Sequence, residues 1–206
     1  ICIPTTAGTG SEATCNASFV DEETNKKMGI NGKNMFAYKA ILDAEVTSSC
    51  PPTAAASAVV DAIVHVLEAY VSKKSSLFTD LICEKAFELI INSIEDLNNI
   101  KANLEKRLDL LKGSFLAGIA QMNAGSGIAS SISYPLSAYY KVPHGIGGGI
   151  FILNIVEFNL SNGFDKYKKL AVYLPREKKE SSSEELMIFL KKIFKKLGIP
   201  NNLKKF

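Results

Sequence analysis

The 206-residue sequence has few of the residues that mark specialised small proteins: four cysteines, two histidines and a net charge of only +3. The cysteines are scattered, with no C-x-x-C pair and no secretory leader pattern, which argues against a disulfide framework and predicts reduced thiols in the cytoplasm. The lysines concentrate after residue 165 and are not interleaved with aromatic residues. We therefore expect a solvated helix surface there and no nucleic-acid partner.

The sequence also lacks an uninterrupted apolar run approaching the roughly 18–20 residues of a membrane span, so no membrane association is expected. Its 47% hydrophobic and 22% charged residues are ordinary for a globular protein with a sizeable core. The chain begins at Ile1, without an initiator methionine and directly in a β-prone stretch. We therefore expect it to be a fragment of a longer protein.

Two regions meet at the Pro51-Pro52 pair, because proline disfavours helix before it and suits a first helical turn. Before this boundary, β-prone segments alternate with polar turns, and strands are expected at residues 1–6, 13–20 and 37–46. After it, apolar residues recur with helical spacing, which predicts helices over residues 53–73, 78–98, 103–122, 146–159 and 183–197. The sequence therefore predicts a β-containing segment followed by an all-helical one.

The first segment with chemical potential is TTAGTGSE, Thr5 to Glu12. Two glycines among small hydroxyl residues can make a turn whose backbone N–H groups and hydroxyls face an anion. The segment is neither a P-loop nor the G-x-G-x-x-G fingerprint. A purely structural turn stays an open alternative.

The second is the pair Asp61 and His65, four residues apart and therefore on one face of a helix, with Glu68 one turn further on. A hydrogen bond between the two side chains on the helix surface is the simpler interpretation. The flanking residues are nearly all apolar, however, which indicates a buried helix. A buried carboxylate needs a cation or a hydrogen-bond network, which favours a metal-ligand role.

The third is His144, held between Pro143 and Gly145 at the start of an apolar helix. A helix N-terminus disfavours an imidazolium, so we expect a neutral ring that can coordinate a metal. With Asp61 and His65, it completes the minimum set of three ligands for a catalytic metal site with an open position.

These pieces, in this order, resemble the iron-containing (group III) alcohol dehydrogenases. The resemblance runs along the whole chain, through IPTTAGTGSEAT, DAIVHVLEAYVS, SLFTD, YPLSAYYKVPHG, VEFN and LGIP. It implies a mostly α-helical chain, in which residues 51–206 form the helical metal-binding domain of a dehydroquinate synthase-like fold, incomplete at its C-terminus. Residues 1–50 would be the last part of an α/β nucleotide-binding domain, with the active site in the cleft between the two.

The resemblance implies an oxidoreductase that uses NAD or NADP to interconvert an alcohol and an aldehyde or ketone. A divalent iron or zinc ion would polarise the carbonyl. A homodimer is implied by resemblance alone, and the family's glycine-rich pyrophosphate loop is expected upstream of this chain. The positions that would contact the cofactor are Thr5, Thr6, Gly8, Thr9, Thr14, Asn16 and Lys27.

The ligand set departs from the family at one position. The family binds its ion through an aspartate and three histidines; Asp61, His65 and His144 match three of them, but Ser130 stands in place of the fourth. A neutral hydroxyl is a much weaker ligand for a transition metal than imidazole. Two interpretations remain open: a three-ligand enzyme, or a degenerate metal-free relative that binds a nucleotide or another ligand without dehydrogenase activity.

Tyr134 is a second departure, because the family usually has another active-site histidine there. If it faces the cleft, Tyr134 could hydrogen-bond the substrate alkoxide or relay its proton, which makes it the candidate catalytic residue. The alternative is that it packs beside Pro135 in the core. Two family glycines are also replaced, by Val59 and Ser137.

Overall fold

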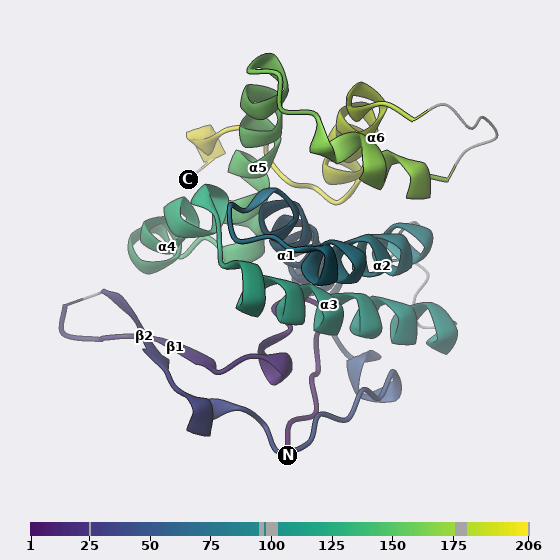
Figure 1. Cartoon of the computed structure of the whole chain (residues 1–206). Helices are drawn as coiled ribbons and strands as arrows, with labels where there is room; N and C mark the ends of the chain where they lie inside the picture. Colours follow the sequence, from purple (N-terminus) through teal and green to yellow (C-terminus); the bar gives the residue numbers. More distant parts are fainter. Residues whose placement is uncertain (25, 95–96, 98–102, 176–180, 206) are drawn as a thin grey trace.

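The computed structural model describes residues 1–24, 26–94, 97, 103–175 and 181–205. Most of this part of the chain is helical, as predicted, and the sheet within it has two strands. Figure 1 shows the helices stacked in layers above a region of irregular backbone that contains the chain's first 50 residues. The main helices are α1 (Pro52–Val71), α2 (Leu77–Ile94), α3 (Leu104–Ala124), α4 (Ile128–Tyr140), α5 (His144–Ser161) and α6 (Ser183–Lys196).

Helix α1 is the central element, in contact with α2, α3, α4 and α5. It begins at Pro52, where the missing N–H of proline costs no helical hydrogen bond. Every residue from Val59 to Tyr70 is buried. This burial confirms the inference, drawn from its apolar flanks, that the helix carrying Asp61 and His65 lies inside the protein.

By length and composition, α1 could cross a membrane, so the expectation that no segment is long and apolar enough was wrong for this helix. The expectation was based on unbroken apolar runs only. In α1, Asp61, His65 and Glu68 interrupt an otherwise strongly apolar sequence. Its most apolar window is 78% buried inside the protein. These are the features of a core helix in a folded domain.

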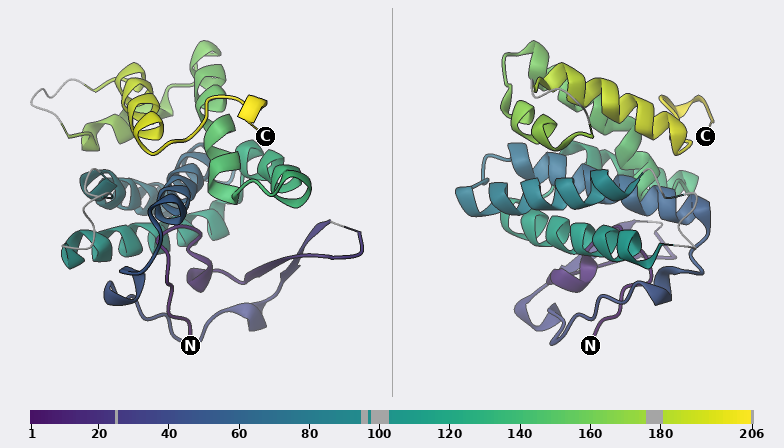
Figure 2. Two further views of the ribbon diagram at one scale, coloured as in Figure 1. Left: turned by 180° about the vertical axis from the view of Figure 1, so that it is seen from behind. Right: turned by 90° about the vertical axis from the view of Figure 1, so that its right-hand side faces the viewer.

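Helix α6 covers the opposite side of the bundle from residues 1–50 (Figure 2). Its first turn is stabilised by a capping box, in which Ser182 and Glu185 satisfy each other's backbone N–H groups. One face, including Leu186 and Leu190, is fully buried. The predicted amphipathic helix over residues 183–197 is therefore confirmed. The eight-residue 3-10 helix η6 (Lys166–Tyr173), which precedes it, was not predicted.

Residues 1–50 contain one antiparallel hairpin, β1 (Asn16–Val20) with β2 (Lys27–Asn31), and the short 3-10 helices η1 (Ser11–Ala13), η2 (Lys33–Met35) and η3 (Glu45–Thr47). The strands expected over residues 1–6 and 37–46 do not form; Cys2 and Ala40 make an isolated parallel bridge instead. Pro4 cannot donate to a continuing ladder, which helps to confine the pairing to one bridge.

The glycines of the TTAGTGSE turn serve close packing against the helices. Gly10 has a φ of +60°, and a Cβ added to it would overlap the backbone of Ser114 and Gly118 on α3. A Cβ on Gly8 would lie 2.8 Å from Ala58 on α1. These contacts hold the start of the chain against the helical region, and only glycine permits them.

Candidate active site

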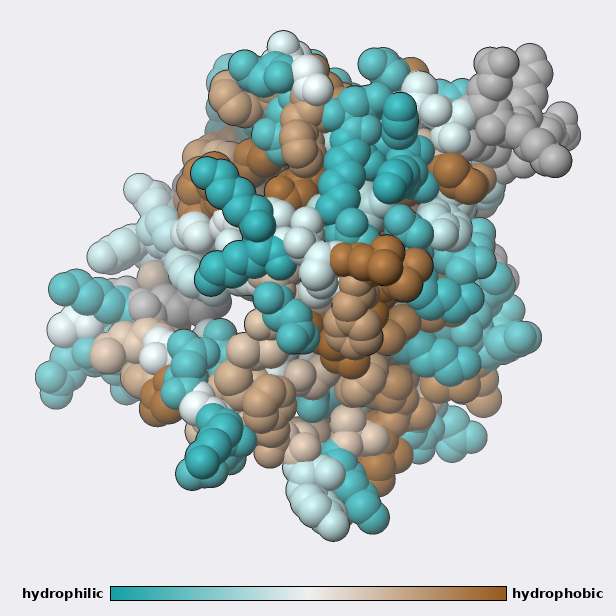
Figure 3. Space-filling view, in the orientation of Figure 1, coloured by the Kyte–Doolittle hydropathy of each residue, from teal (hydrophilic) through white to brown (hydrophobic). Residues whose placement is uncertain are grey.

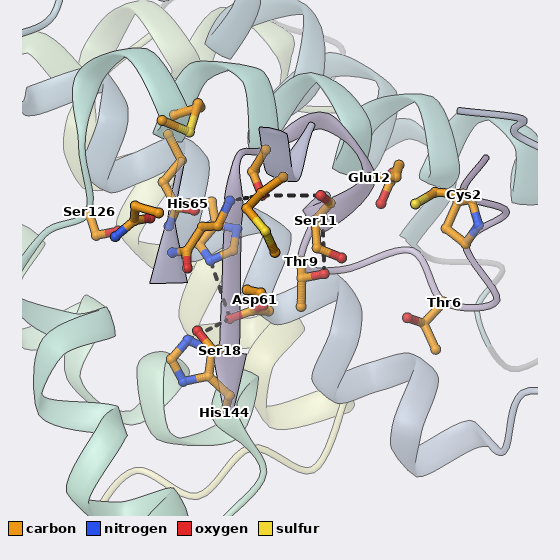
Figure 4. Close-up of a pocket in the computed structure, with 18 of the residues that line it drawn as sticks. Cys2, Thr6, Thr9, Ser11, Glu12, Ser18, Asp61, His65, Ser126 and His144 are labelled. Carbon is orange, nitrogen blue, oxygen red and sulfur yellow. Dashed lines mark hydrogen bonds and ion pairs between the residues drawn. The ribbon is translucent and has the colours of Figure 1, made fainter. Parts of the chain in front are cut away.

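Helices α1 and α5 bring Asp61, His65 and His144 together, as the sequence predicted. The Asp61 Oδ1 atom lies 3.6 Å from His65 Nε2 and 3.8 Å from His144 Nε2. One ligand atom from each residue lies within 4.8 Å of the other two. Figure 4 shows the two imidazoles converging on the carboxylate. Asp61 and His65 are only 3% and 4% exposed, so the cluster is buried on its α1 side.

Gly145 allows α5 to come this close to α1. A Cβ at this position would overlap the carbonyl oxygen of Ser57, one helical turn before Asp61, and would lie 3.0 Å from the Asp61 Cβ. Any larger residue would move the start of α5, and His144 with it, away from Asp61. This close contact explains why a glycine follows His144 in the PHG sequence.

The distances bear on the two interpretations of the Asp61–His65 pair, a hydrogen bond or a metal-ligand role. Separations of 3.6 and 3.8 Å are too long for hydrogen bonds. The structure records no hydrogen bond to Asp61 from any residue that it describes. Ligand atoms held tetrahedrally at about 2.0–2.1 Å from a zinc ion lie roughly 3.4 Å apart, only a few tenths of an ångström closer. One carboxylate and two imidazoles thus fit a divalent ion, whereas a direct hydrogen bond does not explain them.

Ser130 does not join this cluster. Its hydroxyl donates to Glu68 Oε2 at 2.6 Å, and its backbone N–H donates to Glu68 Oε1 at 3.0 Å. Gly127 N–H also donates to Glu68, at 2.9 Å, and a Cβ on Gly127 would lie only 2.6 Å from that carboxylate. Glu68 therefore caps the N-terminus of α4, where its negative charge is favourable. Ser130, at the position where the family has its fourth ligand, therefore supports this cap, and its hydroxyl points toward Glu68.

A cavity of about 900 Å³ opens beside the three candidate ligands. This size is at the upper end for small-molecule sites. Of the residues expected to contact the cofactor, five line the cavity together with Asp61, His65 and His144: Thr5, Thr6, Thr9, Thr14 and Asn16. Gly8 does not line it and packs against α1 instead, while the side chain of Lys27 lies outside the described part of the chain. The structure thus joins the hydroxyl-rich turn and the metal-ligand candidates in one cavity.

Sequence reasoning missed the wall that the end of α3 contributes. Gln121 and Met122 line the cavity from α3, and Gly125 and Ser126 line it from the following turn. The small-residue sequence NAGSG at 123–127 is the only signal that could have indicated a backbone passing close to a ligand.

Two further ionisable side chains line the cavity. The ring of Tyr134 stacks on His144 with centroids 5.2 Å apart. Burial, followed by the negative charges of Asp61 and Glu68, raises the pKa of Tyr134, so its phenol keeps its proton at neutral pH. Burial likewise raises the pKa of Glu12, whose Oε1 atom has no hydrogen-bond partner among the described residues.

Comparison with known proteins links this site to one family. Residues 55–206 match the family model described as Fe-containing alcohol dehydrogenase family, C-terminal, and residues 1–44 match that of iron-containing alcohol dehydrogenase. An NADPH-dependent butanol dehydrogenase of Clostridium saccharobutylicum is 30% identical over 208 residues, which cover 100% of this chain and 53% of the relative. A 4-hydroxybutyrate dehydrogenase of Clostridium kluyveri is 38% identical over 160 residues, covering 75% of this chain and 42% of the relative.

Solved structures agree with the sequence comparison. The crystal structure of a 1,3-propanediol oxidoreductase superimposes with a TM-score of 0.90 at 26% identity, covering 98% of this chain and 54% of that one. A sulfoacetaldehyde reductase from Bifidobacterium kashiwanohense, in complex with NAD+, has the same fold at 24% identity with a TM-score of 0.87; the match covers 98% of this chain and 53% of that one. The chain thus spans about half the length of the relatives that it matches.

Proposed function

Since this chain belongs to the iron-containing alcohol dehydrogenase family, we propose that the protein is an NAD(P)-dependent oxidoreductase that interconverts an alcohol and an aldehyde or ketone. The observation that carries the proposal is the shared cavity. Asp61, His65 and His144 face the same space as the threonines of the TTAGTGSE turn. A metal ion and a nicotinamide cofactor held by these two walls would lie side by side, as hydride transfer to a polarised carbonyl requires.

On the helical wall, Asp61 Oδ1 and the Nε2 atoms of His65 and His144 would hold the divalent ion. When bound, such an ion supplies Lewis-acid polarisation of the substrate oxygen. On the other wall, hydroxyl groups of the cavity-lining threonines and the amide of Asn16 can hydrogen-bond a dinucleotide.

Tyr134 is the residue that we assign to proton transfer. It lines the cavity, and its raised pKa keeps the phenol protonated, so it can donate to the substrate oxygen as negative charge develops there. Tyr134→Phe keeps the stacked ring and removes the proton. We expect turnover to fall about 10²-fold or more with little change in metal content. Unchanged turnover across the pH range would remove Tyr134 from the mechanism.

A second function is supported by one observation: the serine at the fourth ligand position donates to Glu68 and not toward the cluster. With three protein ligands, the fold could persist as a metal-free relative that binds a nucleotide or another ligand. This alternative predicts nucleotide binding without bound metal or turnover.

Metal analysis combined with a kinetic assay separates the two functions. We expect the purified protein, reconstituted with zinc or ferrous iron, to hold about one ion and to oxidise NADH or NADPH in the presence of short aldehydes. Asp61→Asn should lose most of the metal and the activity. The matched control Asp109→Asn, which changes a carboxylate paired with Lys112, should lose neither. Wild-type protein with less than about a tenth of an equivalent of metal, and no cofactor oxidation, would favour the metal-free alternative.

A further inference from the structure

Ser133 lies behind His144, on the side of the imidazole that faces away from Asp61. It belongs to α4, is fully buried, and its Oγ lies 2.6 Å from the carbonyl oxygen of Ser130 and 2.6 Å from His144 Nδ1. A Cβ on Gly147 would lie 2.9 Å from the Ser133 Cβ, so the start of α5 packs tightly against this serine. Both hydrogen-bond contacts are short and enclosed.

The number of hydrogens determines the direction of these two bonds. A serine hydroxyl has one proton, and a carbonyl oxygen can only accept. Ser133 therefore donates to the carbonyl of Ser130, and its oxygen must accept from His144. The proton of the neutral imidazole accordingly lies on Nδ1, and the lone pair that can coordinate a metal lies on Nε2.

Asp61 is the competing acceptor, because its carboxylate would favour a proton on Nε2 of the same ring. Its Oδ1 atom is 3.8 Å from Nε2, beyond hydrogen-bond range, while Ser133 is at 2.6 Å from Nδ1. The serine therefore decides which nitrogen is protonated. His65 lacks such a partner: its Nδ1 is buried without a hydrogen bond among the described residues.

We propose that Ser133 is a positioning residue that holds His144 in the Nδ1–H tautomer, with the Nε2 lone pair directed toward Asp61 and His65. Metal-binding imidazoles commonly rely on such a partner at the second nitrogen, and its loss typically weakens metal binding about 10- to 100-fold. The consequence for metal binding rests on the proposed function. The tautomer itself does not, because it is a property of the metal-free protein.

Nitrogen NMR of the metal-free protein tests the tautomer directly, because the chain has only two histidines. Spectra are recorded near pH 9, well above the ordinary imidazole pKa of about 6.5, and His65→Gln assigns the two rings. We expect a protonated Nδ1 and an unprotonated Nε2 for His144. In Ser133→Ala, the proton should shift toward Nε2. Ser131→Ala is the matched control, because this exposed serine donates to the carbonyl of Gly127 on the same helix.

Zinc titration of the same variants is the second measurement. Ser133→Ala should bind zinc about 10- to 100-fold more weakly than Ser131→Ala. An Nε2–H tautomer in the wild type or an unchanged tautomer in Ser133→Ala would overturn the proposal, and so would equal zinc affinities of the two variants when the wild type binds zinc. A wild type that binds no zinc but shows the tautomer shift would refute the proposed function while leaving the serine's control of the ring intact.

Discussion

The two walls of the cavity are built in different ways. Asp61 and His65 project from α1, whose other faces are buried in the main core, so packing within the described chain positions this wall. The opposite wall, within residues 1–50, has little core of its own, and Figure 3 shows hydrophobic residues over the lower part of the surface, where this region lies. Its exposed large hydrophobic residues are Ile1, Ile3, Phe19, Val20, Met28, Ile30, Met35, Phe36, Tyr38, Ile41 and Val46.

Because of this difference, the geometry of the two walls depends on different contacts. The wall that carries the candidate ligands Asp61 and His65 depends on helix packing, and its geometry should survive changes in the hairpin. The hydroxyl-rich wall depends on a few close contacts with α1 and α3, such as those of Gly8 and Gly10. Because it has few buried apolar contacts, we expect it to open with a lower free energy than the helices.

The largest expected effect is a difference between two phenylalanines, one in the helical core and one in the hairpin. Phe87 on α2 is fully buried, whereas Phe19 on β1 is 43% exposed and pairs with Met28 across the hairpin. Phe87→Ala should lower the free energy of unfolding by about 3–5 kcal/mol, because it leaves a cavity in the core. Phe19→Ala should cost less than about 1 kcal/mol. Denaturant titration measures both, and similar costs would show that the hairpin is packed as firmly as the helices.

An intermediate effect is expected at the α4 cap, near the candidate metal ligands. Ser130→Ala removes one of the donors to the buried Glu68 carboxylate and should lower the free energy of unfolding by about 1–3 kcal/mol. Zinc affinity should change by less than about threefold, because the hydroxyl is turned to Glu68 and is a poor ligand. The control Ser131→Ala should change neither quantity. A large loss of zinc affinity in Ser130→Ala would instead identify Ser130 as a ligand.

The smallest expected effect concerns Glu12, on the hydroxyl-rich wall. Because burial raises its pKa, the folded protein holds this proton more tightly than the unfolded chain. The resulting stability is fully present below about pH 4.5, the ordinary glutamate value, and is lost as the pH rises through the raised pKa. Glu12→Gln should therefore be more stable than the wild type at pH 8, by about 1 kcal/mol, with the advantage disappearing toward pH 4.

Glu22→Gln, at an exposed position near the hairpin turn, is the matched control and should show no such pH dependence. Thermal unfolding of both variants between pH 4 and pH 8 measures the effect. An advantage of Glu12→Gln that is constant with pH would mean that the proton on Glu12 does not contribute.

Local sequence determined most of the helices, although not α4 or η6, and most of the candidate site. Helical periodicity is a property of neighbouring residues, so the helices carrying Asp61 and His144 were predicted within a few residues. The four-residue spacing places Asp61 and His65 on one face of any helix. The two strands predicted at residues 1–6 and 37–46 failed because pairing depends on partners distant in the sequence, which local β-propensity cannot supply.

Tertiary structure alone decided what the serines do and where the residues expected to contact a cofactor lie. Ser130 meets Glu68 across 62 positions in sequence, and Ser133 meets His144 through the contact of α4 with α5. The direction of a hydroxyl depends on which donors and acceptors surround it, and those come from other helices. The sequence by itself determined that three candidate metal ligands are present, while the packing of α1, α4 and α5 decided which side chains hold them in place.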